Sequence, residues 1–320
     1  SDVYKRQGFI DEASTLSIDK KILLVSHMEL GKEHSDQKSI LKYCRENNIF
    51  SNKYEQVLLN AGLKPHSWNI KTPTESTFRS RSLLFFAAGI YIANKISPQC
   101  QLIVPENGTI SINIPLDSGR RSSCSTRTTH PTFIKRIQEA LYTIGISNSI
   151  YNPYRLKSKA DMVLECCQDT SKKAILKSLV DLSCSCAKRG HNVFWDKSGI
   201  EIRNAKIKHC GMCLPCLYRR VALDTIGLDN EALLGTDVLH GIKFNLDNKH
   251  QKRNRDFNAL LYFLKNRMNE RTIRQELFFN GIIEKQELDE YTSLALHSYR
   301  QVINWLKKKA TNEIQIRAGI

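Results

Sequence analysis

The sequence contains no run of 18 apolar residues, so it predicts no membrane-spanning helix. Its first residues are polar and lack the apolar stretch of a secretory signal peptide. It has no internal repeat, no low-complexity segment and no motif that interleaves aromatic and basic residues as RNA-binding surfaces do. What remains is a globular protein, because 320 residues, 41% of them hydrophobic, can form one large or two small domains.

The net charge and the cysteine content indicate which partners and which cellular setting to expect. The net charge is +16, which leaves open nucleic acid or a nucleotide as a partner, or simply a solvated basic surface. Four of the ten cysteines are spaced as metal ligands rather than as a disulfide framework. We therefore expect a reducing, cytoplasmic setting and no membrane association.

The first residues of the chain, 1–7, resemble the translated end of a sequencing adaptor. On this interpretation residues 1–19 are a sequencing scar or a disordered start, and they do not belong to the fold. The chain would then be an N-terminally truncated fragment of a longer protein.

Short apolar segments alternate with helical patterns, which predicts an α/β fold with a mostly parallel sheet. Strands are expected at 21–26, 67–71 and 101–104, an extended segment at 150–154, and a strand or loop at 109–114. Helices are expected at 36–47, 81–94, 132–142, 158–166, 258–268, 271–279 and 285–309. The helix at 81–94 is apolar nearly all round, so it should be buried. Ser158, with Asp161 three residues later, predicts an N-cap and a weak capping box.

Three cysteines in two overlapping C-x2-C steps, Cys210, Cys213 and Cys216, are the most specific pattern in the chain. Thiolates at this spacing on a tight turn can face one ion, and a tetrahedral zinc site needs a fourth ligand. Cys184, Cys186, His191 and His209 are the nearby candidates. Four thiolates would close the coordination shell, so the site would be structural. An iron–sulfur cluster and free core thiols are the alternatives.

The segments around this cysteine cluster resemble the zinc motif of the 7-cyano-7-deazaguanine synthase (QueC-like) family. The segments that carry the resemblance, in chain order, are Arg81–Ser82, Pro131–Leu141, Asn152–Tyr154, Ser158–Asp161, Asp181–Cys184 and Cys210–Arg220. Three more segments are closer to a divergent branch, the QueC-like component of Qat anti-phage defence systems (QatC): Pro105–Gly108, Asn113–Leu116 and Ser125–Pro131. The resemblance covers roughly residues 20 to 226 and makes Cys184 the fourth zinc ligand.

The resemblance implies an adenine-nucleotide alpha-hydrolase-like (Rossmann-like) fold. Residues 20–183 would form an ATP-pyrophosphatase-like α/β domain, 184–226 a four-cysteine zinc knuckle and 227–320 a C-terminal helical extension. The full-length protein would be a ligase that uses ATP and Mg²⁺ to adenylate a 7-deazaguanine carboxylic acid. A protein from the same defence system would be a candidate acceptor of the activated acid. The family's S-G-G-x-D-S phosphate loop is absent from these 320 residues, so the fragment should not turn over ATP.

Several residues are candidates for the site, and each has a structural alternative. The catalytic candidates are Lys159, Arg127 and His130. The alternatives are that Lys159 is a surface residue and that Arg127 and His130 belong to a solvated loop. Arg81 and Ser82 would bind the nucleotide, with a structural ion pair of Arg81 as the alternative. Glu106 and Asn107 follow a strand and would bind the substrate base, or else form a plain turn. Three other cysteines, Cys124, Cys166 and Cys167, are expected to be small core residues.

Two further functions remain open. One is a tRNA-modifying ATP pyrophosphatase of the same fold, and the other is a non-enzymatic zinc-knuckle adaptor that binds nucleic acid. A strong decrease of affinity with salt would favour either of them.

Overall fold

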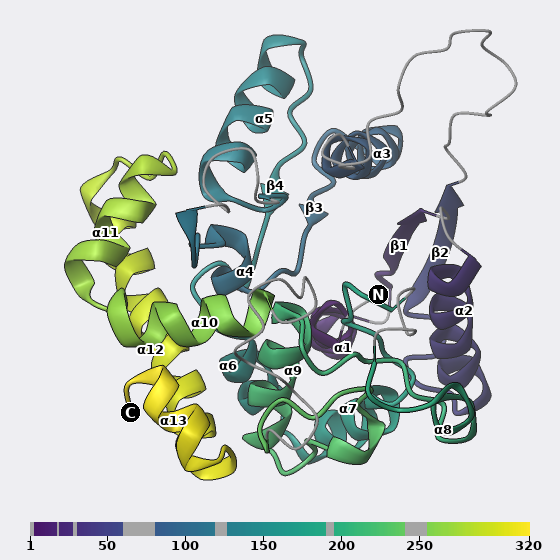
Figure 1. The fold of residues 1–320 in the computed structure, drawn as a ribbon. Helices are drawn as coiled ribbons and strands as arrows, with labels where there is room; N and C mark the ends of the chain where they lie inside the picture. The colour runs from purple at the N-terminus through teal and green to yellow at the C-terminus, as the bar shows by residue number, and fades with distance from the viewer. Residues whose placement is uncertain are drawn as a thin grey trace, which may run out of the picture.

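The computed structural model describes residues 3–17, 19–27, 31–59, 81–118, 127–189, 195–240 and 255–320. This part of the chain is rich in helices and contains two small parallel sheets, a composition consistent with the predicted α/β class (Figure 1). In these residues no helix combines the length and apolarity needed to cross a membrane.

Each of the two sheets contains two strands. In the first, β1 (Ile22–His27) pairs in parallel with β2 (Tyr54–Leu59), and α2 (Gly31–Glu46) forms the crossover between them. In the second, β3 (Leu102–Ile103) pairs in parallel with β4 (Ile150–Tyr151). Helix α3 (Arg81–Ile96) contacts both β1 and β3. The strands expected at 21–26 and 101–104 are thus confirmed, β2 was not predicted, and the strand expected at 67–71 lies outside the described residues.

Two sequence predictions are wrong in this region. Helix α3 buries only one face, with Phe86 and Ile90 each 3% exposed, whereas Leu84 and Tyr91 on its other face are 36% and 63% exposed. The segment predicted as a strand or loop at 109–114 instead contains a short helix, α4 (Gly108–Ile112). Asn107 caps α4 by accepting a hydrogen bond from the backbone N–H of Ile110. This cap and the burial of α4 outweigh the β propensity of its Thr and Ile residues.

The expected disordered start at 1–19 is also wrong, because residues Val3–Thr15 form helix α1. Its side chains Phe9, Ile10 and Ala13 are buried in a core that they share with α2, α6 and α7. Phe9 also makes an edge-to-face contact with Tyr54 of β2, with ring centroids 5.1 Å apart. The start of the chain is therefore part of the packed fold.

The middle of the chain adds helices α5 (Pro131–Thr143), α6 (Lys159–Cys166), α7 (Thr170–Val180), α8 (Gly199–Asn204) and α9 (Leu214–Asp224). The predicted cap of α6 is confirmed: Ser158 accepts from the N–H of Asp161, and the Asp161 carboxylate accepts from the N–H of Ser158. Helix α9 packs closely against α6. Its residues Leu217 and Val221 belong to the larger core, whereas Ala222 and Leu223 belong to the smaller core under α1, so α9 joins the two.

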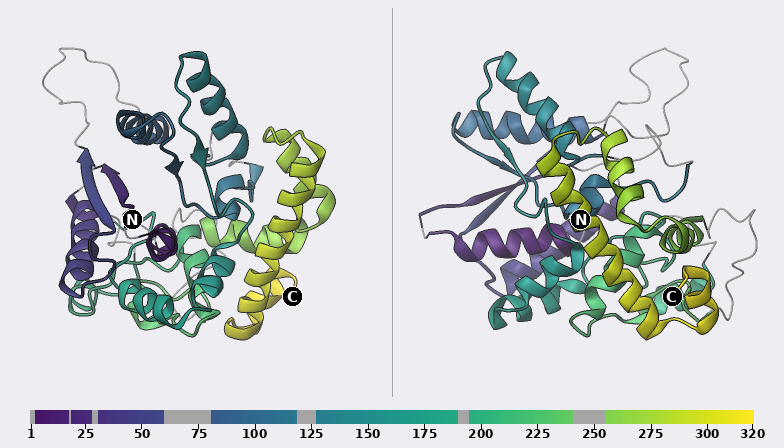
Figure 2. Two further views of the ribbon diagram at one scale, coloured as in Figure 1. Left: turned by 180° about the vertical axis from the view of Figure 1, so that it is seen from behind. Right: turned by 90° about the vertical axis from the view of Figure 1, so that its left-hand side faces the viewer.

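From residue 255 onward the chain forms helices, as predicted: α10 (Arg255–Asn266), α11 (Glu270–Phe279), α12 (Lys285–Lys309) and α13 (Asn312–Ala318). A short 3-10 helix, η4 (Glu231–Leu233), precedes them. These helices gather on the side of the molecule opposite β1, β2 and α2 (Figures 1 and 2). Their apolar faces share one core with the cysteine region, and α12 contacts α4, α6 and α9. The boundary expected between 226 and 227 therefore runs through a continuous core.

Candidate functional site: a four-cysteine metal centre

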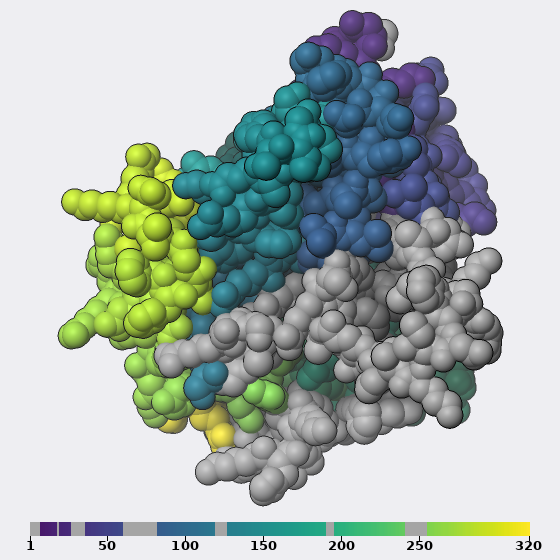
Figure 3. All heavy atoms as spheres, turned by 90° about the horizontal axis from the view of Figure 1, so that it is seen from above, coloured from purple at the N-terminus to yellow at the C-terminus, as the bar shows by residue number. Residues whose placement is uncertain are grey.

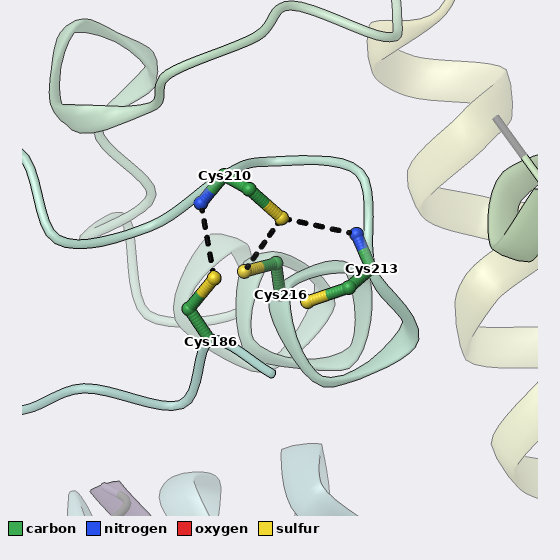
Figure 4. Close-up of side chains that lie close together, drawn as sticks. All are labelled: Cys186, Cys210, Cys213 and Cys216. Carbon is green, nitrogen blue, oxygen red and sulfur yellow. Dashed lines mark hydrogen bonds between the residues drawn. The ribbon is translucent and has the colours of Figure 1, made fainter. Parts of the chain in front are cut away.

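Four thiols converge at the start of α9. Cys210 and Cys213 lie on the turn before the helix, Cys216 lies in its first turn, and Cys186 comes from the segment after α7 (Figure 4). Their sulfur atoms all lie within 4.8 Å of one another, and those of Cys210 and Cys216 are 3.8 Å apart. Four Zn–S bonds of about 2.3 Å in a tetrahedron would place the sulfurs roughly 3.8 Å apart. The four side chains could therefore hold one metal ion.

The fourth thiol of this cluster is Cys186, whereas the family resemblance implied Cys184. The backbone N–H of Cys210 donates to the Cys186 sulfur at 3.3 Å, which holds that side chain over the turn. The Cys184 sulfur instead lies 3.5 Å from the carbonyl oxygen of Lys208, outside the cluster. The two cysteines are separated by one residue, so the local backbone directs only one of them inward.

Backbone N–H groups donate hydrogen bonds to two of these sulfurs, those of Cys186 and Cys210, and of the two it is Cys210 whose pKa favours a thiolate. The N–H groups of Met212 and Cys213 donate to the Cys210 sulfur at 3.4 and 3.3 Å, and the N–H of Lys188 donates to the Cys186 sulfur at 3.3 Å. Hydrogen bonding with Cys186 and the other two thiols lowers the pKa of Cys210 well below its usual range. A thiolate is the form that binds a metal ion.

Gly211 sets the turn that brings Cys210 and Cys213 to the same side. Its φ of +83° lies in the left-handed region, which glycine adopts without strain. A Cβ at this position would also lie 2.2 Å from the carbonyl oxygen of Thr236. Only glycine fits both requirements.

The two arginines after the cysteines, Arg219 and Arg220, anchor α9 to the surrounding chain. Arg219 donates to the Ser183 hydroxyl at 2.6 Å and to the Val180 carbonyl at 2.8 Å, just upstream of Cys186. Arg220 is 1% exposed, and its guanidinium pairs with Asp229 and Glu231 at 3.1 and 2.6 Å. The Arg219 contacts fix α9 to the segment that supplies the fourth thiol, and the Arg220 contacts fix it to the segment that follows α9.

Another group of predicted site residues lies where β3 and β4 end. Glu106 and Asn107 follow β3, and the side chain of Asn152, just after β4, bonds both the N–H and the carbonyl of Glu106. Glu106 is buried and its Oε1 accepts from the side chain of Asn107 at 3.1 Å. Because Asn107 also caps α4, its side chain has a clear structural role.

The loop that carries Arg127 and His130 is connected to this group. Thr129 of the loop hydrogen-bonds Ser111, which in turn donates to the carbonyl of Asn107. Ser82 near the start of α3 hydrogen-bonds Thr128 at 2.7 Å. Burial, followed by the charge of Arg127, lowers the pKa of His130 to about 4, so this imidazole is neutral at pH 7.

Two other candidates are placed differently. Lys159 is buried at the first position of α6 and is not a surface residue. Arg81 begins α3, but its side chain lies outside the described residues. Hydrogen bonds thus join Ser82, Glu106, Asn107 and the 127–130 loop in one network, and the amide of Gly108 donates to the carbonyl of Lys157, close to Lys159.

Sequence reasoning missed the role of the C-terminal helices at these loops. Ser298 of α12 hydrogen-bonds Thr109 of α4 at 2.6 Å, and Gln301 of α12 bonds both Ser158 and Asp161 at the cap of α6. These partners are 140 to 189 residues apart in the chain. No local pattern in the sequence could have revealed them.

The other cysteines fit the expectation of core residues in part. Cys166 is buried, and burial raises the pKa of its thiol to about 12, so it is inert as a nucleophile. Cys167 is half-buried, and Cys124 lies outside the described residues.

No family model matches the chain, and neither a curated protein nor a solved structure matches it.

Proposed function

We propose that Cys186, Cys210, Cys213 and Cys216 bind one structural Zn²⁺ ion. The observation that supports this proposal is that the four sulfurs lie within 4.8 Å of one another, with one pair at the 3.8 Å expected of a tetrahedral site. All four positions would be taken by the protein, which leaves none for a substrate. When bound, the ion would hold the segment after α7 to the start of α9, the helix that joins the two cores.

Cobalt substitution tests this metal assignment against the iron–sulfur alternative. Apo-protein refolded with Co²⁺ should show the visible absorption of tetrahedral cobalt with thiolate ligands, and added Zn²⁺ should remove it. Protein purified without added metal should be colourless. A brown protein that contains iron and inorganic sulfide would contradict the zinc assignment.

For the activity, we propose ATP-dependent activation of a 7-deazaguanine carboxylic acid by the full-length protein. The proposal rests on the ordered QueC-like motifs of the sequence, and the placement of Glu106 supports it. In parallel α/β sheets ligands bind beyond the carboxyl ends of the strands, where Glu106 and Asn152 meet. The two parallel strand pairs, bridged by α3, would belong to an adenine-nucleotide alpha-hydrolase-like sheet.

Adenylation makes a poor electrophile reactive. A carboxylate oxygen of the acid attacks the α-phosphorus of ATP, a new P–O bond forms, and the bond to the β-phosphate breaks to release pyrophosphate. ATP would be the cosubstrate, and Mg²⁺ would be the cofactor that binds its phosphates. Because negative charge crowds at this centre, catalysis would come from positioning and charge stabilisation by cations such as Arg127 and Lys159.

The other assigned residues would bind rather than react. Glu106 would accept hydrogen bonds from the edge of the base, with Asn107 fixing its carboxylate. Arg81 and Ser82 would contact the nucleotide. His130 would contribute a neutral imidazole. We also propose a cytoplasmic setting in anti-phage defence, with a protein from the same system as acceptor of the activated acid.

Pyrophosphate release measures this activity directly. The protein in its natural length should release pyrophosphate from ATP only when 7-carboxy-7-deazaguanine is present, and 7-deazaguanine without the carboxylate should not replace it. Equal rates of release with and without the acid would reject this substrate. Binding of the acid to the present chain, measured by calorimetry, gives a second readout that requires no turnover.

A second candidate is nucleic-acid binding, either by a tRNA-modifying pyrophosphatase or by a non-enzymatic adaptor. The net charge of +16 favours it. Affinity for tRNA or DNA that falls steeply with salt concentration would support this candidate. An absence of binding even at low salt would eliminate it.

A further inference from the structure

Three buried polar atoms on residues that lie together have no hydrogen-bond partner in the part of the chain that the structure describes. They are Nε of Arg127, Nε2 of His130 and Nδ2 of Asn280. His130 itself is only 1% exposed. A buried polar group left unpaired costs about 1–3 kcal/mol, and native proteins leave few of them. Three in one place indicate a group that the chain binds there.

Direct contacts place these residues at the N-terminal end of α5. The guanidinium Nη2 of Arg127 donates to Oδ1 of Asn280, and the backbone N–H of His130 donates to the Arg127 carbonyl at 3.3 Å. Thr132 in the first turn of α5 donates to the carbonyl of Gly281 at 2.8 Å, which holds the end of α11 against α5. Figure 3 shows the yellow-green C-terminal helices directly against the teal segment that contains α5.

The N-terminus of α5 itself has no side-chain cap. His130 is the N-cap residue and makes no side-chain bond to the helix, and Pro131 follows it. An uncapped helix N-terminus favours negative charge because its free N–H groups and the helix dipole face outward. The 13-residue helix α5 therefore adds a favourable field beside the three neighbouring residues that carry the unpaired atoms.

The chemistry of the three atoms specifies the ligand. A guanidinium N–H and an amide NH2 can only donate, and a neutral imidazole donates from Nε2 in one of its two tautomers. Three donors and one fixed positive charge fit an oxyanion. The negative charge of Glu276 acts on Arg127, but Glu276 also forms an ion pair with Arg267. The single carboxylate is therefore shared between two arginines.

We propose that Arg127, His130 and Asn280 form an oxyanion subsite at the N-terminus of α5, for a carboxylate or a phosphate group. The subsite deepens the proposed function and rests on it for the identity of the natural ligand: the carboxylate of the deazaguanine acid or a phosphate of ATP. Asn280 makes α11 of the C-terminal region a part of this subsite, a role that the sequence did not indicate.

The test follows the side-chain Nε–H resonance of Arg127 by NMR in the whole chain. Acetate is the carboxylate probe, inorganic phosphate is the phosphate probe, and chloride at equal ionic strength is the control. We expect a saturable shift with acetate or phosphate but not with chloride, and the tighter of the two identifies the group. Arg136→Gln, which removes an exposed arginine of α5, should leave the shift unchanged.

Two variants decide the outcome. Asn280→Asp supplies an internal carboxylate to Arg127, so it should weaken oxyanion binding at least about tenfold while the chain stays folded. Arg127→Lys removes the Nε donor but keeps the charge, and calorimetry should show a similar loss. Full-strength binding in both variants, or a shift that chloride or an adventitious ion reproduces, would overturn the subsite. Oxyanion binding without binding of 7-carboxy-7-deazaguanine would instead reject the proposed substrate and leave the subsite intact.

Discussion

The sulfur of Cys186 accepts a hydrogen bond from the backbone N–H of Cys210, 3.3 Å away and 24 residues later in the chain. This contact closes the thiol cluster and selects Cys186 over Cys184 as the fourth ligand. Because Cys210 begins the turn into α9, one metal ion at this point would hold the segment after α7 to the helix along which the two cores meet.

Gly211→Ala should destabilise the chain and weaken metal binding. The substitution forces an L residue into a left-handed conformation, which costs about 1–2 kcal/mol, and brings its Cβ against the Thr236 carbonyl. Gly227→Ala is the matched control, because Gly227 also has a positive φ but its Cβ would meet no atom within 4 Å. Urea unfolding should show a larger loss for Gly211→Ala. Equal losses in the two variants would mean that the close approach to Thr236 is unimportant.

Ser158→Ala should lose more stability than Ser198→Ala, although both serines cap a helix through a capping box. Removal of an N-cap serine costs about 1 kcal/mol, which is what we expect for Ser198. Ser158 also donates to Gln301 of α12, and the loss of that bond should add about 1 kcal/mol. Thermal unfolding of the two variants measures the difference. Identical melting temperatures would argue against a bracing role of α12 at this loop.

His130 should make stability depend on pH. Its pKa is about 4 in the folded chain and near 6.5 when unfolded, so the unfolded state binds the proton more readily between these values. The contribution of neutral His130 to the free energy of unfolding is fully present above about pH 6.5. It is lost as the pH falls towards 4, by at most about 1.4 kcal/mol per pH unit.

Urea unfolding at several pH values, in buffers free of phosphate and carboxylates, measures this dependence. His130→Gln should flatten the slope between pH 4 and 6.5 by up to one proton. A slope identical to that of the wild type would show that His130 is not the group responsible.

The sequence predicted what depends on local patterns. The spacing of Cys210, Cys213 and Cys216, the cap at Ser158 and the helices after 255 all follow from short-range rules of ligand spacing, capping and periodicity. The parallel strands β1 and β3 were also visible as short apolar runs between helices.

The remainder depends on contacts that are distant in the chain. The choice between Cys184 and Cys186 is made by the backbone of Cys210, and burial against α12 makes the segment after Asn107 a helix. Asn280 lies 153 residues from Arg127, so its place beside that arginine follows only from the contact between the end of α11 and the start of α5. Because α3 is apolar nearly all round, the sequence predicted that it is buried, but only one face of the helix is buried in the structure.

The zinc content of three proteins, measured by native mass spectrometry, tests the metal centre most directly. The wild type and Cys184→Ser should each carry one zinc ion per chain, whereas Cys186→Ser should lose it and unfold at lower urea concentration. In small zinc peptides such a site contributes roughly 10–16 kcal/mol, so the loss should be large. A wild-type chain without metal, or zinc that is lost from Cys184→Ser and kept by Cys186→Ser, would contradict the account.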